Sequence, residues 1–290
     1  SSVLIDDNVL KAIREVQDLA PLHNPPNISG IEAAKEMLPN IPQIAVFDTA
    51  FHQTMPTEAF LYAVPYEWYS KYGVRRYGFH GTSHLYVSRR AALLLGRDPK
   101  ETNLITLHIG NGVSITAIKN GVSVDTSMGL TPLEGAVMGT RCGDLDPAII
   151  LFMIQTEGFT PAQIESILNK KSGLLGITEK YMDRRDVEQA AKAGDQRCQL
   201  AMAIEAYRLR KYIGTYSAAL GHVDAVVFTA GAGELSPILR EQVLTGLGNL
   251  GIKIDQKINA VTRSRSKETQ ISTPDSPVKV FVVPTDEEMV

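Results

Sequence analysis

Apolar and polar residues follow one another in patterns that predict helices near the start of the chain and strands further on. Apolar residues at helical spacing predict two helices, over residues 8–19 and 31–37. Between them, the three prolines of residues 21–27 (PLHNPPN) predict a rigid loop without regular structure. Residues 41–47 (IPQIAVF) are short, apolar and β-branched, and they predict a buried strand that ends at Asp48.

The middle of the chain carries the pattern of an antiparallel meander. A helix is predicted at residues 83–95, and three short runs of apolar and β-branched residues follow it. These runs predict strands over residues 103–108, 113–118 and 122–125. The turn GNG joins the first two strands, and an Asn-Gly pair typical of two-residue hairpins joins the last two.

Helices and two more strands are predicted in the last half of the chain. Helical patterns dominate residues 147–220, interrupted by a loop at residues 171–179. A strand at residues 225–229 leads through the loop AGAGE (residues 230–234) to another helix. The last predicted strand, residues 278–283, ends in PTDEE. The mixture of strands and helices predicts an α/β fold.

No strong signal divides the chain into domains. It has no repeat of solenoid or propeller period and no low-complexity linker. We place the predicted boundary at the turn after Asp48. This division gives a short first part, residues 1–48, and one large domain, residues 49–290.

Composition and charge restrict the class of protein. The chain has 290 residues, 44% hydrophobic and 21% charged, as in an ordinary globular protein. Its 29 basic and 32 acidic residues nearly cancel and form no long block, so we expect no nucleic-acid or membrane partner. Without a signal-peptide pattern or a bilayer-spanning apolar run, a cytoplasmic protein with small-molecule ligands is expected. Cys142 and Cys198 have no metal-ligand spacing, so neither a disulfide nor a zinc site is predicted.

Two glycine-containing loops are candidates for holding a nucleotide. The chain has neither a GxxxxGK[ST] phosphate loop nor a GxGxxG fingerprint after a strand. Glycines in GNG (residues 110–112) and AGAGE (residues 230–234) would let backbone N–H groups approach phosphate oxygens closely. A plain hairpin turn and a strand-to-helix turn without ligand are the alternatives.

Arg141 is a candidate for binding an anionic group. Its neighbours in GTRCGDLDP are small, and its planar fork of donors matches phosphoryl or carboxylate oxygens. The alternative is that Arg141 pairs with Asp144 or Asp146 and holds the loop together. Asp146 followed by Pro147 also resembles a helix start, with Asp146 as the N-cap.

Histidines occur in several candidate contexts. His80 lies in YGFHGTSH and His108 at the end of a predicted strand, and imidazole can donate to the charge that builds on a transferred phosphoryl group. A structural role is expected for His23, His52, His84 and His222. Ser83 beside His84 allows a hydrolase hypothesis, but the spacing is not GxSxG.

Carboxylates at predicted strand ends could hold a metal ion. Asp48 and Glu287 each follow a buried strand in the prediction, and such oxygens suit Mg²⁺, or Mn²⁺, together with phosphate oxygens and water. For Glu287 the alternative is a solvated chain end. Residues 182–186 (MDRRD) are interpreted as a charged helix start, with a ligand contact as the alternative.

Seven stretches together resemble the acetokinase family, the acyl-phosphate-forming kinases of the actin-like ATPase superfamily. They are PLHNPPN, FDTAFHQTMP, RRYGFHGTSH, HIGNGVSITAI, DTSMGLTPLEGAVMGTRCGDLDP, FTAGAGE and PTDEE, in this order. The resemblance implies a ribonuclease-H-like fold and reversible in-line transfer of a phosphoryl group from ATP to acetate, which yields ADP and acetyl phosphate. It also implies a homodimer and a Mg²⁺ ion.

The resemblance also assigns roles to residues. It places Asp48 at the reacting carboxylate and has His80 and Arg141 stabilise the transferring phosphoryl group, while Glu287 binds Mg²⁺. The pocket for the acid's methyl group corresponds to Leu22, Phe79 and Pro132. The residues that match the family's nucleotide site are His108, Ile109, Gly110, Asn111, Gly112, Asp183, Arg184, Arg185, Gly231, Ala232, Gly233, Glu234 and Leu235.

Parts of the family's pattern have no match here. The family begins with a strand and a Ser-rich phosphate loop and later supplies a second substrate arginine, so residues 1–48 resemble a remnant of its first domain. The chain also starts at Ser1 rather than Met, and it stops just after Glu287, short of the family's last helix. Little or no activity is therefore expected of these 290 residues. The alternatives are a propionate or butyrate kinase, and a nucleotide-binding module that cannot catalyse the reaction.

Overall fold

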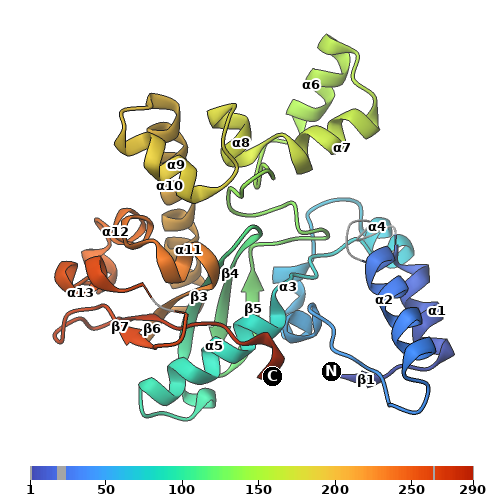
Figure 1. Cartoon of the computed structure of the whole chain (residues 1–290), viewed down its shortest axis with the longest axis horizontal. Helices are drawn as coiled ribbons and strands as arrows, with labels where there is room; N and C mark the ends of the chain where they lie inside the picture. Colours follow the sequence, from blue (N-terminus) through green and yellow to red (C-terminus); the bar gives the residue numbers. More distant parts are fainter. Residues whose placement is uncertain (1, 18–23, 264, 290) are drawn as a thin grey trace.

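The centre of the molecule is a six-stranded mixed sheet, which confirms the α/β prediction (Figure 1). The computed structural model describes residues 2–17, 24–263 and 265–289. The sheet has the order β5-β4-β3-β6-β8-β7. Its strands are β3 (Asn103–Ile109), β4 (Val113–Lys119), β5 (Val122–Thr126), β6 (Ala225–Thr229), β7 (Thr269–Gln270) and β8 (Lys279–Val282).

The strand pairing combines a hairpin meander with parallel crossovers. β3, β4 and β5 pair antiparallel, as the sequence pattern predicts. β6 then pairs parallel to β3, and β8 parallel to β6, with helices in both connections. β7, which the sequence did not predict, pairs antiparallel with β8 at the edge. The carboxyl ends of β3, β6 and β8 therefore meet at one edge of the sheet, where α/β proteins commonly bind ligands.

Helices cover both faces of the sheet (Figure 1). α5 packs on one face and the long α10 on the other. The helices are α1 (Asp7–Glu15), α2 (Asn24–Met37), α3 (Thr57–Phe60), α4 (Tyr66–Tyr72), α5 (Gly81–Leu94), α6 (Ala148–Glu157), α7 (Pro161–Lys170), α8 (Gly173–Thr178), α9 (Arg184–Lys192), α10 (Gln196–Leu220), α11 (Ala230–Leu235), α12 (Pro237–Leu244) and α13 (Gln256–Val261).

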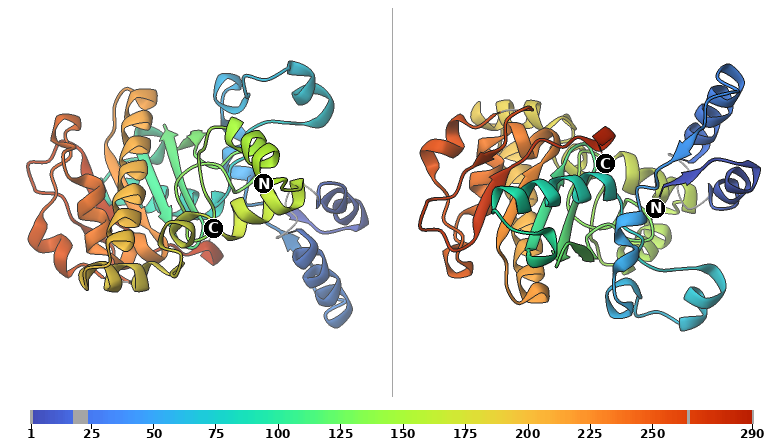
Figure 2. Two further views of the ribbon diagram at one scale, coloured as in Figure 1. Left: turned by 90° about the horizontal axis from the view of Figure 1, so that it is seen from above. Right: turned by 90° about the horizontal axis from the view of Figure 1, so that it is seen from below.

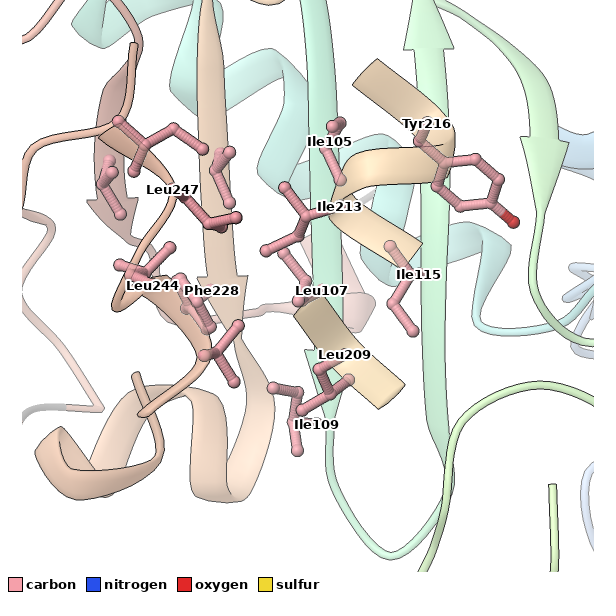
Figure 3. Close-up of a cluster of buried hydrophobic side chains, with 14 of the residues drawn as sticks. Ile105, Leu107, Ile109, Ile115, Leu209, Ile213, Tyr216, Phe228, Leu244 and Leu247 are labelled. Carbon is pink, nitrogen blue, oxygen red and sulfur yellow. The ribbon is translucent and has the colours of Figure 1, made fainter. Parts of the chain in front are cut away.

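Side chains of β3 alternate between the two faces, because successive residues of a strand point in opposite directions. Ile105 and Leu107 join the large core under α10, where they meet Leu209 and Ile213 (Figure 3). Leu104 points to the other face and packs in the cluster under α5. Truncating a buried aliphatic side chain of this kind typically costs about 2–5 kcal/mol, so this packing holds the sheet in place for the site.

The predicted buried strand at residues 41–47 is wrong in extent and in burial. Only β2 (Ile44–Ala45) is extended, and it pairs with β1 (Val3–Leu4) in a two-stranded sheet. Ile44 is 64% exposed and Val46 52%. The apolar run alone did not determine burial, because this sheet and helices α1 and α2 lie beside the main sheet rather than on it (Figure 2).

The proline-rich stretch at residues 21–27 is only partly a loop. α2 begins at Asn24 and takes Pro25 and Pro26 into its first turn. The first turn of a helix needs no backbone N–H donors, so proline is tolerated there, and the prediction of irregular structure is wrong for these residues. Leu22 and His23 lie outside the described residues.

Three further predictions need correction. The loop predicted at residues 171–179 contains α8, and the sequence AGAGE forms most of α11 instead of a loop. Helix α6 begins one residue later than predicted, at Ala148. The carboxylate of Asp146 still acts as its cap, because Oδ1 accepts the Ala148 N–H at 2.9 Å.

The segment that carries Arg141, residues 127–146, has no regular secondary structure and is held by side chains from elsewhere. Arg76 donates through Nη1 to the carbonyl oxygens of Thr126, Ser127 and Met128 and through Nη2 to Glu134. Asp144 accepts the Gly135 N–H at 2.9 Å and the Tyr212 hydroxyl at 2.6 Å. These contacts replace the hydrogen bonds that a helix or strand would provide.

Gly173 supports the same segment from behind. It has a φ of +61°, and a Cβ atom there would lie 2.1 Å from the carbonyl oxygen of Met138 and 2.7 Å from that of Arg141. The Leu174 N–H donates to the Met138 carbonyl at 2.9 Å. Only glycine allows α8 to approach this backbone so closely.

We expect Gly173→Ala to destabilise the fold strongly, because the loop that carries Arg141 must move. The matched control is Gly158→Ala, which has a similar φ of +69° but no heavy atom within 4 Å of the new Cβ. The control should cost about 1 kcal/mol through the left-handed backbone alone. Gly173→Ala should cost about 2 kcal/mol more. Urea unfolding measures both, and equal losses would show that the close contact is unimportant.

Candidate active site

A pocket of about 280 Å³ opens at the edge where the parallel strands end. It collects residues from the turn after β3, from the start of α9 and from α11, three segments far apart in sequence. Its lining residues are Ile109, Gly110, Asn111, Val113, Gly139, Leu174, Met182, Asp183, Arg184, Arg185, Glu188, Glu205, Gly231, Ala232, Leu235, Ser236 and Arg265. A concave site built mostly from backbone and apolar groups, with a few charges, suits a small-molecule ligand.

The structure brings together most of the residues assigned to a nucleotide. Nine of them line the pocket: Ile109, Gly110, Asn111, Asp183, Arg184, Arg185, Gly231, Ala232 and Leu235. His108, Gly112, Gly233 and Glu234 are not among its lining residues. Their contact with a nucleotide stays a prediction.

Glu234 has a contact that the sequence did not suggest. Its Oε1 accepts the Ala230 N–H at 2.8 Å and the Thr285 N–H at 3.2 Å. The side chain therefore ties α11 to the PTDEE segment. Ala230 itself has a φ of +62°, unusual for a residue with a side chain, and the hydrogen bond that its N–H donates to Glu234 helps to hold it there.

The charged stretch at residues 182–186 is both a helix start and part of the pocket. Asp183 is the N-cap of α9, and its carboxylate accepts the Arg185 N–H at 2.8 Å. Arg184 turns inward to an ion pair with Glu205, and its Nε lies 3.5 Å from Glu188. Burial lowers the pKa of Arg184 to about 10. Sequence reasoning missed Glu188 and Glu205, whose helical positions give no sign of the pocket.

Arg141 is held without a carboxylate partner. Its Nη1 donates to the Pro132 carbonyl at 2.7 Å, and it forms no ion pair with any residue that the structure describes. The alternative of pairing with Asp144 or Asp146 is wrong, because Asp144 bonds Gly135 and Tyr212 and Asp146 caps α6. Burial lowers the pKa of Arg141, since its charge loses solvent without gaining a counter-ion.

His80 and Arg141 meet beside Gly112. A Cβ atom at Gly112 would lie 3.2 Å from Arg141 Nη2 and 3.2 Å from His80 Nε2, so both side chains flank one small region. His80 has a φ of 57° and precedes α5 directly. Its ring stacks on that of His108, with centroids 4.0 Å apart and planes inclined by 16°. Two nitrogen groups converging on one point can hold an anionic oxygen.

Asp48 and Glu287 face one hydroxyl group. Thr82 Oγ1 lies 3.4 Å from Asp48 Oδ1 and 3.3 Å from Glu287 Oε2. Asp48 Oδ2 also accepts the His80 N–H at 2.6 Å, at the start of α5. Loss of solvent, followed by the charge of Asp48, raises the pKa of Glu287.

This pair of carboxylates fits a Mg²⁺ ion. Among the described residues, no group of three or more His, Cys, Asp or Glu side chains gathers in a metal-ligand arrangement. Mg²⁺ usually takes one or two protein carboxylates and completes its shell with phosphate oxygens and water. Because the two like charges raise the cost of ionisation, a cation between them would relieve their repulsion.

The acid pocket is only partly visible in the described residues. Phe79 is partly buried against the main core, and it directly precedes His80. Pro132 contacts Arg141 through its carbonyl group. Leu22 lies outside the described residues, so the grouping of all three stays a prediction.

The histidines assigned to structure are held in structural contacts. Burial lowers the pKa of His52 to about 4 and that of His84 well below its usual value, so both are neutral. His222 lies at the surface, 2.9 Å from Asp224. Ser83 is fully buried, so a substrate cannot reach its hydroxyl and the hydrolase hypothesis is wrong.

Sequence reasoning missed two hydroxyl groups that contact His84. Thr106 and Ser114 are fully buried and contact its two ring nitrogens. Alternation within β3 and β4 is a signal that could have found them, because polar residues there occupy the face opposite Ile105 and Ile115.

None of the described helices is both long and apolar enough to cross a membrane.

Known proteins resemble this chain along its whole length. The model of the acetokinase family matches residues 1–290. The acetate kinase of Geobacter sulfurreducens is 67% identical over 289 residues, which cover 100% of this chain and 69% of that protein. The acetate kinase structure from Porphyromonas gingivalis has a TM-score of 0.94 and 52% identity, over 99% of this chain and 71% of that one. The structure of a propionate kinase from Francisella tularensis has a TM-score of 0.93 and 45% identity, over 99% of this chain and 73% of that one.

These superpositions confirm the predicted actin-like ATPase fold. They also agree with the resemblance that the seven sequence stretches indicate. The chain belongs to the acetokinase family.

Proposed function

We propose that this chain transfers a phosphoryl group between ATP and acetate, with ADP and acetyl phosphate as the products. The observation that carries the proposal is Arg141, a half-buried guanidinium without a described carboxylate partner, which meets His80 beside the nucleotide pocket. A site with unneutralised positive charge next to a small-molecule pocket suits the transfer of a group that carries negative charge. The names of the relatives at 65–67% identity agree with acetate as the acid.

The proposed mechanism relies on position and charge. The nucleotide lies in the pocket between the turn after β3 and α11, with its phosphates near Gly110 and Gly112. The acid is already ionised at neutral pH, so its carboxylate can attack without a general base. Arg141 and His80 stabilise the charge on the equatorial oxygens of the transferring group. A Mg²⁺ ion held by Glu287 and Asp48 would neutralise part of the phosphate charge.

Acetate is proposed over larger acids, with Phe79, Pro132 and Leu22 as the wall of the methyl pocket. A propionate kinase shares the fold at 45% identity. One methylene group changes selectivity by only about 1–3 kcal/mol, so the two acids need a direct comparison.

A homodimer in the cytoplasm is also part of the proposal. Helix α6 supports association, because Ile149, Leu151 and Phe152 are exposed in a single copy, the last two at 62% each. An apolar helix face of this kind is commonly buried between subunits. The free thiols of Cys142 and Cys198 agree with a reducing compartment.

The reaction is tested by incubating the chain with ATP, Mg²⁺ and acetate in the presence of hydroxylamine, which traps acetyl phosphate as the hydroxamate. We expect hydroxamate formation at a low rate, because the family's phosphate loop has no match in these residues. In the reverse direction, ATP should form from ADP faster with acetyl phosphate than with propionyl or butyryl phosphate. Calorimetry with ATP accompanies the assay on the same sample. Binding without turnover would support the non-catalytic module, and absence of both would contradict the nucleotide site.

In a chain that also carries the family's phosphate loop, we expect Arg141→Ala to reduce turnover on the order of 10³-fold or more, because loss of a charge-stabilising arginine in phosphoryl transfer has this effect. Arg141→Lys should recover little of the loss, since a lysine lacks the planar fork. The matched control is Arg197→Ala, a surface arginine on α10 paired with Glu179, which should leave turnover unchanged. Near-normal turnover in Arg141→Ala would refute the role of this side chain.

Glu287→Gln should have opposite effects on the melting temperature with and without Mg²⁺. The raised pKa of Glu287 means that its carboxyl group binds a proton more tightly in the folded chain than in the unfolded chain. Above that pKa the ionised carboxylate therefore lowers the stability of the fold. Without Mg²⁺ at neutral pH, the variant should gain up to about 2 °C in Tm, and the gain should vanish as the pH falls through the Glu287 pKa.

With ADP present, added Mg²⁺ should raise the Tm of the unaltered chain more than that of Glu287→Gln. Glu288→Gln, a change at the neighbouring exposed residue, is the control for both measurements. Equal Mg²⁺ stabilisation in all three proteins would show that Glu287 does not contact the ion.

A further inference from the structure

Three buried side chains behind His80 form a continuous hydrogen-bonded chain. Thr106 Oγ1 lies 2.6 Å from His84 Nδ1, and His84 Nε2 lies 2.7 Å from Ser114 Oγ. Ser114 Oγ in turn lies 2.8 Å from His80 Nδ1. This series of hydrogen bonds runs from Thr106 on β3 to His84 on α5 and then to Ser114 on β4. It ends at His80, which lies beside Arg141.

Its members have no access to solvent. Thr106, His84 and Ser114 each have an exposed fraction of 0%. Water therefore cannot complete their hydrogen bonds, and each hydroxyl proton must find an acceptor within the protein. A buried polar group left without a partner costs about 1–3 kcal/mol.

The proton of Thr106 determines the direction of the chain. Among the described residues, His84 Nδ1 is the only hydrogen-bond partner of Thr106 Oγ1. The hydroxyl therefore donates to Nδ1, which must be the unprotonated nitrogen of the ring. Burial lowers the pKa of His84 well below its usual value, so the ring is neutral and carries its one proton at Nε2.

The same order continues to the active site. His84 Nε2–H donates to Ser114 Oγ, and the only other described partner of that oxygen is His80 Nδ1. The Ser114 proton therefore points to His80 Nδ1, which accepts it. In the reverse order Thr106 would keep a buried proton without an acceptor, and that order is less favourable by the cost of one unmade hydrogen bond.

We infer that Thr106, His84 and Ser114 are positioning residues that hold His80 in the tautomer with its proton on Nε2, so that the imidazole donates to the transferring phosphoryl group. The second half of this inference rests on the proposed function. His80 Nε2 and Arg141 Nη2 lie at the same distance, 3.2 Å, from one point beside Gly112, so two donors converge there. The opposite tautomer would present a lone pair to the phosphoryl oxygens and repel them.

The neighbouring charges agree with this arrangement. His108 stacks on His80 but bonds to a different hydroxyl, Ser83 Oγ, at 2.8 Å. Burial lowers the pKa of His108 well below its usual value, so the ring stacked on His80 carries no positive charge. Asp48 accepts the backbone N–H of His80, whereas Ser114 contacts Nδ1 of its ring.

Nitrogen-15 NMR of histidine-labelled protein tests the first half without any catalysis. His80 is assigned from the signal lost in His80→Gln. In the ligand-free chain we expect an Nε2–H tautomer for His80 and for His84. Ser114→Ala should shift His80 towards a mixture of tautomers, because the variant removes the hydroxyl that donates to Nδ1. An Nδ1–H tautomer of His80 in the unaltered chain would overturn the inference.

The matched control is Thr116→Val. Thr116 is fully buried on the same face of β4 as Ser114, but its hydroxyl bonds Thr126 at 2.9 Å and lies outside the chain of three. Thr106→Val removes the hydroxyl that sets the direction at nearly constant volume, and Thr106→Ser retains it. The His80 tautomer should change in Thr106→Val and persist in Thr106→Ser and Thr116→Val. An unchanged tautomer in both Thr106→Val and Ser114→Ala would overturn the inference.

Steady-state kinetics test the second part of the inference, that His80 donates to the transferring phosphoryl group. Thr106→Val should lower kcat about tenfold, as expected for loss of one hydrogen bond's worth of transition-state stabilisation, with little change in KM for ATP. Thr106→Ser should restore kcat. A changed tautomer with unchanged kcat would refute the donor role of His80, while an inactive unaltered chain with the expected tautomer would contradict the proposed function alone.

Discussion

The site depends on the parallel pairing of β3, β6 and β8. Parallel strands end at the same edge of a sheet, so the segments that follow them meet although they are far apart in sequence. The turn after β3, helix α11 and the PTDEE segment gather there, and Glu234 links the last two through one carboxylate. Packing of α5 and α10 on opposite faces keeps these strand ends in place, because both helices contribute to the buried clusters that hold the sheet.

The distribution of charge on the irregular segment explains why Arg141 is available for a ligand. Each carboxylate near it already has partners, since Glu134 bonds Arg76 and Asp144 bonds Tyr212 and a backbone N–H. Arg141 keeps only a neutral carbonyl partner among the described residues, and Gly173 allows the backbone behind it to pack closely. A half-buried cation without a counter-ion lowers the stability of the fold when no ligand is bound. An anionic ligand would offset this loss.

Strand alternation connects the core to the chemistry. On the α10 side, β3 and β4 present only apolar residues to the core. On the α5 side their residues become polar towards the strand ends at the site, where Thr106 and Ser114 hold His84 and His80 in sequence. The α5 face therefore buries apolar residues at one end and hydrogen-bonded hydroxyl and imidazole groups at the other, which fits a site that must order a proton.

Local pattern determined much of this protein. The meander of β3 to β5, the strand β6, the last strand to within a residue, and the segments that identify the family follow from periodicity, turn residues and motifs, because these depend on neighbours in sequence. Tertiary structure decided the rest. The predicted burial of residues 41–47 was wrong because this segment pairs in a two-stranded sheet that lies beside the main sheet. The prolines of α2 were accepted because the first turn of a helix needs no backbone N–H donors. Three features arise only when distant segments pack together: the partners of Arg184, the lack of a carboxylate partner for Arg141 among the described residues, and the direction of the hydrogen bonds from Thr106 to His80. They depend on which groups are shielded from solvent and which acceptor is within reach.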